Sequence, residues 1–392
     1  MQYNFDEIID RHNTNSYKWD GCDNKEMLPM WVADMDFKTA PCVIEALEKR
    51  VKHGIFGYAM APDEYYEAII NWFKLRHNFE IKKESIVYTI GVVPAVSVCI
   101  KAICEKGDKV LIQTPVYNCF YSSIRNCECT FAGNALSYDG NGHYSIDFED
   151  LENKASDPKV KMMLLCNPHN PSGRVFTADE LRKIGEICNK HNLIVVSDEI
   201  HCEFVHHDHV YTPFALACPQ LRDKIVTLTA PSKAFNLAGL QTANIIVDNE
   251  ELRKKINRVI NIFEVCDIGP LGITALIAAY SEEGGKYLDA LNAYLEENFK
   301  IFKEFFNRNL PQFKVTELEG SYLAWVDCSC LNKDSKQIEE ELKKEVNLWL
   351  NAGRHYGIEG KNFMRFNLAC PKARLLDGLE RFKKYVIKTI NY

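Results

Sequence analysis

The residue with the most distinctive setting is Lys233, which follows a short apolar stretch and lies among small side chains. Residues 224–229, Lys-Ile-Val-Thr-Leu-Thr, predict a buried strand that ends at Pro231. Burial of an ammonium group without a partner is costly, so most lysines lie in solvent. A lysine just past the end of a buried strand can instead keep its amine near neutrality and form a Schiff base with an aldehyde. Taken alone, the stretch favours the ordinary alternative, a surface lysine in a strand-to-helix turn.

Four more residues with useful chemistry follow four other predicted strands. The strands and the residues that follow them are 86–89 with Gly91, 109–113 with Tyr117, 159–166 with Asn170, and 193–197 with Asp198. In a parallel sheet, ligands bind outside the carboxyl ends of the strands. One polar residue at a strand end is routine, but five residues at one edge, Lys233 included, form a candidate site.

The chemistry of this edge matches an aldehyde cofactor that carries a phosphate, a phenolic oxygen and a pyridine nitrogen. Lys233 would supply the imine to the aldehyde. The Gly91-Val92-Val93 turn opens a predicted helix, and its free amides would bind the phosphate. Asp198 would keep the pyridine nitrogen protonated, so that the ring acts as an electron sink.

Each of the remaining side chains at this edge has a chemical role and an ordinary alternative. Asn170 would donate to the phenolic oxygen, or would only form a turn between two prolines. Tyr117 would stack on the ring, or would belong to the core. His201 would lie near the phenolic oxygen, or would be an interior imidazole with ordinary partners. Asp198 itself, together with Glu199, could simply cap a helix.

Two stretches outside the predicted sheet also carry residues of interest. Arg365 lies in an otherwise apolar predicted strand, and a buried arginine demands an anion, so a structural carboxylate or a substrate carboxylate should face it. Residues 28–37 are aromatic and apolar with two acids, and their spacing fits neither a helix nor a clean strand. Core packing is the ordinary explanation for Trp31 and Met35; a segment that lines a crevice is the alternative.

The elements that must position these residues form an α/β arrangement. Strands and helices alternate from about residue 80 to 250, which predicts a largely parallel sheet with helices on both faces. Thr177-x-x-Glu180 forms a capping box at the start of one of these helices. From about 276, interleaved strands and helices predict a smaller α+β domain. The other predicted elements are helices at 6–10, 41–52, 63–77, 287–308 and 335–352, strands at 322–326 and 363–369, and a final helix from about 374.

The composition is that of an ordinary globular protein, with 392 residues of which 46% are hydrophobic. A net charge of -7 and the absence of a long basic run argue against a nucleic-acid-binding protein. The first twenty residues do not resemble a secretory signal, and no apolar run approaches the about 20 residues of a membrane span. Fifteen cysteines form no C-x-x-C pair, and Cys127 and Cys129 have no matching partner block. We therefore expect reduced thiols, no metal, and a cytoplasmic location.

Several motifs resemble those of known enzymes over essentially the whole chain. Three motifs are similar to those of fold-type I pyridoxal-phosphate enzymes, in the class I/II aminotransferase superfamily. They are Asn-Pro-His-Asn-Pro-Ser-Gly at 167–173, Ser-Asp-Glu-Ile-His at 197–201, and Ala-Pro-Ser-Lys at 230–233 with Gly239. Those that resemble the cystathionine β-lyase, or cysteine C–S lyase, branch are the segments 5–11 and 18–20, the block 29–37, and Asp-Glu-Ile-His at 198–201.

The resemblance implies a domain organisation and a cofactor. It implies an N-terminal arm over 1–45 that joins the small domain, a large domain over 46–275 with a mostly parallel, seven-stranded type of sheet, and a small domain over 276–392. The implied cofactor is pyridoxal 5'-phosphate, and the implied partner is a small-molecule amino-acid substrate.

The resemblance also implies roles for individual residues. Lys233 would bind the cofactor and then move the α-proton of the substrate. Arg365 would bind the substrate carboxylate, with Ala33 and Tyr58 also at the substrate. Tyr58 would reach the site from a neighbouring subunit as a catalytic residue, which implies a homodimer. The implied cofactor-binding residues are Gly91, Val92, Val93, Tyr117, Asn170, Asp198, His201, Ser232 and Lys233.

Three positions depart from the aminotransferase pattern. That pattern has a serine three residues before the lysine and an arginine eight residues after it, both on the phosphate, but here these positions hold Ala230 and Gln241. Position 201 is His where aminotransferases usually have Tyr. The phosphate must therefore rely more on backbone amides, on Ser232 and on Tyr58. These departures favour a β-lyase that cleaves cystathionine or related cysteine S-conjugates; an aminotransferase and a cofactor-binding regulatory protein are the alternatives.

Overall fold

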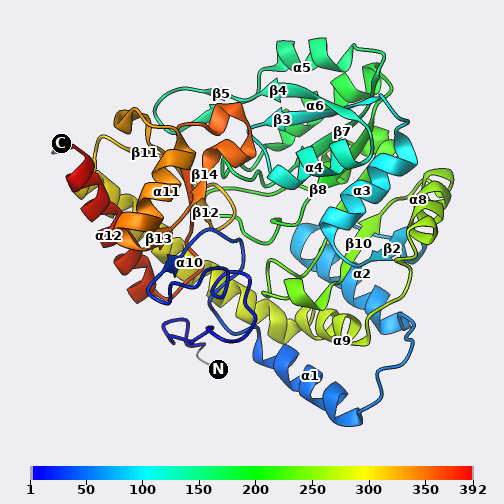
Figure 1. Ribbon diagram of the computed structural model, residues 1–392. Coiled ribbons are helices and arrows are strands. Elements are labelled where there is room, and N and C mark those ends of the chain that lie inside the picture. The colour runs from blue at the N-terminus through cyan, green and yellow to red at the C-terminus, as the bar shows by residue number, and fades with distance from the viewer. Residues whose placement is uncertain (1–2, 391–392) are drawn as a thin grey trace.

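The computed structural model describes residues 3–390, and its central feature is a seven-stranded sheet (Figure 1). In spatial order its strands are β2 (Ile86–Thr89), β10 (Ala243–Ile246), β9 (Ile225–Thr229), β8 (Ile194–Asp198), β7 (Val160–Cys166), β3 (Lys109–Thr114) and β4 (Thr130–Ala135). Every pair is parallel except the two that β10 makes with β2 and β9. The prediction of a largely parallel sheet is confirmed.

Helices cover both faces of this sheet because successive residues of a strand point to opposite faces. Leu111 and Val195 face one apolar core, whereas Ile112 and Val196 face the other. The first core is covered by α2 (Asp63–His77), α5 (Phe148–Ala155), α6 (Ala178–Lys190), α7 (Phe214–Ala217) and α9 (Pro270–Ala279). The second is covered by α3 (Val92–Ile103), α4 (Asn118–Asn126) and α8 (Glu250–Ile262).

The C-terminal part builds a second, smaller sheet with its own core, drawn in orange and red in Figure 1. Its antiparallel strands, in spatial order, are β11 (Lys314–Val315), β12 (Leu323–Asp327), β15 (Phe363–Asn367) and β14 (Asn351–Ala352). They pack with α11 (Ser335–Val346) and α12 (Lys372–Ile390). The long helix α10 (Glu282–Asn309) joins the two parts, because Tyr287 and Leu291 belong to the first large-sheet core and Phe302 to the small core.

The N-terminal residues run along both parts of the molecule. β1 (Leu28–Pro29) pairs in parallel with β13 (Leu348–Trp349), beside the small sheet. α1 (Pro41–His53) packs against α9 of the large part. The remaining short elements are the hairpin of β5 (Ser137–Tyr138) and β6 (Tyr144–Ser145) and single-turn helices at 83–85, 219–224, 238–240, 329–331, 353–356 and 358–360.

Two helix predictions are wrong. Residues 6–10 form no helix, because a five-residue segment cannot repay helix nucleation and tertiary contacts hold it instead, such as Phe5 against Phe37. The predicted helix 335–352 ends at Val346, since Asn347 adopts a left-handed conformation with φ 52° and the chain continues as β13 and β14. The capping box of Thr177 and Glu180 is confirmed, with both reciprocal hydrogen bonds present.

Within residues 3–390, no helix combines the length and the apolar character that crossing a membrane requires.

Candidate active site

A cavity of about 200 Å³ lies at the carboxyl ends of the parallel strands. The five residues predicted to share this edge all line it: Gly91, Tyr117, Asn170 and Lys233 follow β2, β3, β7 and β9, and Asp198 is the last residue of β8. The structure therefore brings together side chains that are up to 142 positions apart in the sequence (91 to 233). Five other predicted site residues also line the cavity: Ala33, Val92, Val93, His201 and Ser232.

Lys233 reaches into this cavity with its amine. Its Nζ atom donates a hydrogen bond to the carbonyl oxygen of Ala33 at 2.8 Å. Burial, and then the positive charge of Arg365, lower the pKa of Lys233 to about 8, while Asp34 and Asp198 oppose this change. This pKa leaves about a tenth of the amine neutral at pH 7, and the neutral amine is the form that a lysine nucleophile or proton acceptor needs.

Asp198 presents a buried carboxyl group to the same cavity. Burial raises its pKa to about 7, and the backbone N–H of Ile200, at 3.2 Å from Oδ1, opposes this rise. Within the described part of the chain, no lysine or arginine forms an ion pair with this carboxyl group. His201, three residues later, is also buried, and its Nδ1 atom has no hydrogen-bond partner. Burial lowers the pKa of His201 to about 3, so the imidazole is neutral.

The start of α3 forms another wall of the cavity. Gly91 is the N-cap residue, and Val92 and Val93 are the first two helical residues. Their amides belong to the first helical turn, where backbone N–H groups have no partner within the helix. Pro94 follows them and has no N–H group. This wall therefore has the donors and the dipole direction that suit a phosphate.

Arg365 is buried on β15. Its Nη1 donates to Oδ1 of Asn170 at 3.1 Å, and its Nη2 donates to the carbonyl oxygen of Trp31 at 2.7 Å. Its guanidinium lies over the ring of Tyr356 at 4.9 Å, and its Nε has no hydrogen-bond partner. In residues 3–390, no carboxylate forms an ion pair with it. Of the two anions considered from the sequence, the structural carboxylate is therefore absent from the described residues.

Arg365 is not a lining residue of the cavity but donates to one, Asn170. Tyr58 lies apart from the cavity. It follows α1 in an irregular segment, and 97% of its surface is exposed. Several cavity residues were not predicted as site residues from the sequence: Ile90, Pro94, Cys166, Ile200, Ala238, Gln241 and Thr242. Most of these lie within a few positions of a predicted site residue, so the neighbourhood of each strand end is the signal that could have found them.

One residue of the segment 28–37, Ala33, lines the cavity, whereas Met35 is buried in a core of the large sheet. The Ala33 carbonyl oxygen accepts from Lys233 and also from the Tyr322 hydroxyl at 3.1 Å. Two asparagines that sequence reasoning missed also hold this segment. Asn236 accepts from the N–H of Met35, and Asn367 donates to the carbonyl oxygens of residues 32 and 34.

These residues fit pyridoxal phosphate on observations of this structure. The cavity offers an amine with a lowered pKa for the aldehyde and a buried carboxyl group without a cation for the ring nitrogen. It also offers a helix N-terminus for the phosphate and an aromatic side chain, Tyr117, for the ring. The pattern of donors and acceptors is that of a site built for a ligand with these three groups.

Comparison with known proteins places these observations in a family. The family model for aminotransferase class I and II matches residues 25–382. The chain is 40% identical over 384 residues to cystathionine beta-lyase PatB of Bacillus subtilis, covering 97% of this chain and 99% of that protein. Cystalysin from Treponema denticola, solved with pyridoxal 5'-phosphate, is 37% identical with a TM-score of 0.95 and covers 99% of this chain and 100% of that one. A pyridoxal-phosphate-bound C–S lyase from Staphylococcus hominis is 35% identical with a TM-score of 0.93 and covers 99% of each chain.

Proposed function

The chain belongs to the family of class I and II aminotransferases, and we propose that within this family it is a pyridoxal-phosphate-dependent carbon–sulfur β-lyase. Its substrates are cystathionine or related cysteine S-conjugates. The reaction removes the α-proton, breaks the Cβ–S bond and releases a thiol; the remaining enamine takes up water and yields pyruvate and ammonia. The Lys233 amine, of lowered pKa, in one cavity with the buried carboxyl group of Asp198 supports the use of the cofactor. The observation that carries a lyase is the 35–40% identity to C–S lyases over nearly the whole chain.

The proposed roles follow from the positions of the side chains. When bound, pyridoxal phosphate supplies the electron sink that makes the α-proton acidic. Lys233 takes that proton, because its amine is buried in the cavity and has a neutral fraction near neutral pH. Arg365 orients the substrate through its carboxylate, because its guanidinium has no carboxylate partner within residues 3–390. Asp198 holds a proton at the ring nitrogen through a charge-assisted hydrogen bond.

The test uses purified protein with L-cystathionine and no keto acid, and it measures pyruvate, ammonia and thiol over time. A catalytic rise of all three products together supports β-elimination. Lys233→Ala should abolish this turnover, and wild-type turnover in that variant would overturn the proposal. If no pyruvate forms and the cofactor is converted to its amine form, the protein is an aminotransferase. If the protein shows the cofactor's absorbance but neither products nor a spectral change appear, a regulatory role becomes the favoured alternative. Capture of a protein partner tests that role.

We further propose that two copies of the chain form a homodimer with shared sites. An exposed apolar patch supports this: Val51, Ile55, Phe56, Tyr58, Met60, Ile262 and Phe263 are each at least 45% exposed. A bridge between Ala59 and Ile268 joins the two segments that carry it. Exposed apolar surface of this kind is typical of an interface. Tyr58 at its centre would then enter the partner's site.

Hybrid dimers test the sharing of sites directly. Tyr58→Phe and Lys233→Ala are each expected to be inactive or nearly so. If Tyr58 acts across the interface, a hybrid of the two variants has one intact site and one doubly altered site. A random 1:1 mixture should then regain about a quarter of the parent activity, because half of its dimers are hybrids. Mixtures that stay as inactive as the separate variants would refute the exchange of Tyr58.

A cytoplasmic location is also part of the proposal. All fifteen cysteines are unpaired thiols, and ten of them are buried. Thiols persist in reducing compartments, whereas exported proteins tend to form disulfides. Detection of the protein in a fractionated cell lysate tests this.

A further inference from the structure

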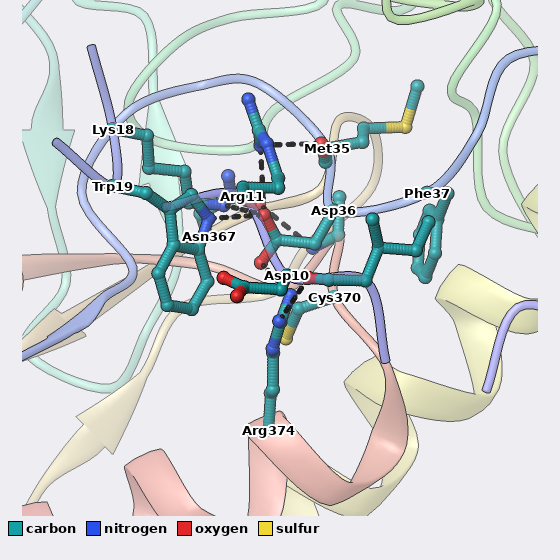
Figure 2. A network of polar contacts seen from close by, with 12 residues as sticks. Asp10, Arg11, Lys18, Trp19, Met35, Asp36, Phe37, Asn367, Cys370 and Arg374 are labelled. Carbon is teal, nitrogen blue, oxygen red and sulfur yellow. Dashed lines mark hydrogen bonds and ion pairs between the residues drawn. The ribbon is translucent and has the colours of Figure 1, made fainter. Parts of the chain in front are cut away.

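A buried ionic cluster around Asp36 lies behind the wall of the active site (Figure 2). The Oδ1 atom of Asp36 accepts from Arg11 Nη1 and from Trp19 Nε1, both at 2.9 Å, and lies 3.1 Å from Lys18 Nζ. Its Oδ2 atom lies 3.3 Å from Arg374 Nη1. The aspartate is 2% exposed, so four donors surround a carboxylate that water barely reaches.

The cluster stays charged despite its burial. Burial alone would raise the pKa of Asp36, but Lys18, then the Trp19 N–H and the two arginines, lower it below its usual value. Asp34 adds a second carboxylate, which accepts from Arg11 Nη2 at 2.8 Å. Three cations therefore face two carboxylates. Buried ion pairs of this kind contribute little net stability compared with apolar packing, so their presence calls for another explanation.

The cluster connects three parts of the chain that are distant in sequence. Arg11, Lys18 and Trp19 come from the N-terminal residues, and Arg374 comes from α12 of the small part. Arg11 also donates to the Met35 carbonyl oxygen at 3.1 Å. The segment 34–36 is thus held from one side by charged groups of both the N-terminal residues and α12.

The other side of this segment forms contacts with the active site. The carbonyl oxygen of Ala33 accepts from Lys233, and that of Trp31 accepts from Arg365. Asn367 donates hydrogen bonds to the carbonyl oxygens of residues 32 and 34. The segment 31–36 therefore contacts the ionic cluster on one side and Lys233 and Arg365 on the other.

We propose that the Asp36 cluster is a positioning device for the active site: it holds segment 31–36 so that the carbonyl oxygens of Ala33 and Trp31 orient Lys233 and Arg365. Asp36, Lys18, Arg11 and Trp19 are then positioning residues, because they act through this main chain and do not line the cavity. The Ala33 carbonyl holds the lysine amine while it is free to move a proton. This assignment of a role in proton transfer depends on the proposed lyase function.

The first readout does not depend on any activity. In the full chain without cofactor, trace reductive methylation with formaldehyde measures the reactivity of the Lys233 amine against pH. We expect a midpoint near the pKa of about 8 for the parent. An acceptor oxygen stabilises the ammonium form, so a misplaced Ala33 carbonyl lowers the midpoint. Asp36→Asn should lower it by about half a pH unit or more, through lost position and lost negative charge.

A second variant separates position from charge. Trp19→Phe removes one hydrogen bond to Asp36 and alters no charge. Positioning predicts a smaller downward change of the Lys233 midpoint in this variant as well, whereas an effect of electric field alone predicts none. Trp19→Phe also decides the question if Asp36→Asn fails to fold. The control is Asp248→Asn. The Asp248 carboxylate pairs with Arg222 and Ser85. Asp248 follows β10 and Ser85 precedes β2, so this pair lies at the edge of the sheet opposite the cavity.

The second readout uses the holoenzyme and an S-conjugate deuterated at Cα. Misplacement of Lys233 should reduce kcat about tenfold or more in Asp36→Asn and raise the deuterium isotope effect on kcat, because proton transfer becomes slower. Asp248→Asn should change neither. If the parent makes no pyruvate, the lyase proposal fails, and the methylation profile alone then decides the positioning of Lys233. Folded Asp36→Asn and Trp19→Phe variants with the parent's Lys233 midpoint would overturn the inference, whatever their melting temperatures.

Discussion

The proposed substrate contact of Arg365 leads to a quantitative prediction. Arg365 is 3% exposed, and its guanidinium donates to Asn170 and Trp31, so that within residues 3–390 its Nε has no partner. A carboxylate that binds here would complete the set of donors. Arg365→Lys keeps the positive charge but loses the planar pair of donors, so that about one charge-assisted hydrogen bond is lost. Such a bond contributes about 1.5–3 kcal/mol.

The expected effect on catalysis follows from that value. Because each 1.4 kcal/mol is a factor of ten, kcat/KM for an S-conjugate should fall about 10- to 150-fold in Arg365→Lys. The assay measures pyruvate formation from the S-conjugate and from its α-carboxamide, which has the same shape around Cα but no charge. The parent should strongly prefer the acid, and the preference should shrink in Arg365→Lys by about the same factor.

The control for this experiment is another buried arginine. Arg174 pairs with Glu180 and Glu319, so a structural role explains it fully. Arg174→Lys should lower the melting temperature without any change in the ratio of acid to carboxamide. An Arg365→Lys enzyme that keeps the parent's ratio would refute the argument that an unpaired buried guanidinium marks the carboxylate site.

Three further predictions follow from the structure. The folded chain keeps a proton on Asp198 up to pH about 7, whereas the unfolded chain releases it near pH 4; the free energy of unfolding of cofactor-free protein should therefore decrease from pH 4 to 7, and Asp198→Asn should lack this decrease in thermal melts. The lowered pKa of Lys233 acts in the opposite direction: the free energy of unfolding should increase from about pH 8 to 10.5, and Lys233→Ala should lack that increase. Thr177→Ala removes the N-cap of α6 and should cost about 1 kcal/mol in denaturant unfolding, with pyruvate formation unchanged.

The sequence was sufficient to predict the edge that forms the site. Buried strands appear as apolar runs that end at Gly, Pro, Asn or Asp, and the rule that ligands bind at their carboxyl ends then groups residues from five strands. Gly91, Asn170, Asp198 and Lys233 line one cavity for this reason. The local signal is strong because each residue lies at the end of its strand or within four residues of it.

Contacts between distant segments were not predictable in the same way. Asn236 and Met35 are 201 positions apart, and Asn367 and Val32 are 335 positions apart, so no periodic pattern links them. The ionic cluster of Arg11, Lys18 and Asp36 was equally hidden, because charged residues in irregular segments usually indicate a solvated surface. The helix predicted over 335–352 was wrong for a local reason, since a single asparagine in a left-handed conformation ends it at 346.

The departures at positions 230 and 241 have a physical explanation in the proposed reaction. A transaminase must retain its cofactor for half of each cycle without a covalent bond to lysine, so strong side-chain donors on the phosphate are needed. In a β-lyase, Lys233 would hold the cofactor again at the end of every turnover, so that the phosphate donors would not be its sole anchor. Anchoring of the phosphate by the α3 amides, with no cation at position 241, would then be tolerable. Substitutions in the Asp36 cluster, which acts on Lys233 through the Ala33 carbonyl, should accordingly reduce turnover more than substitutions at the phosphate.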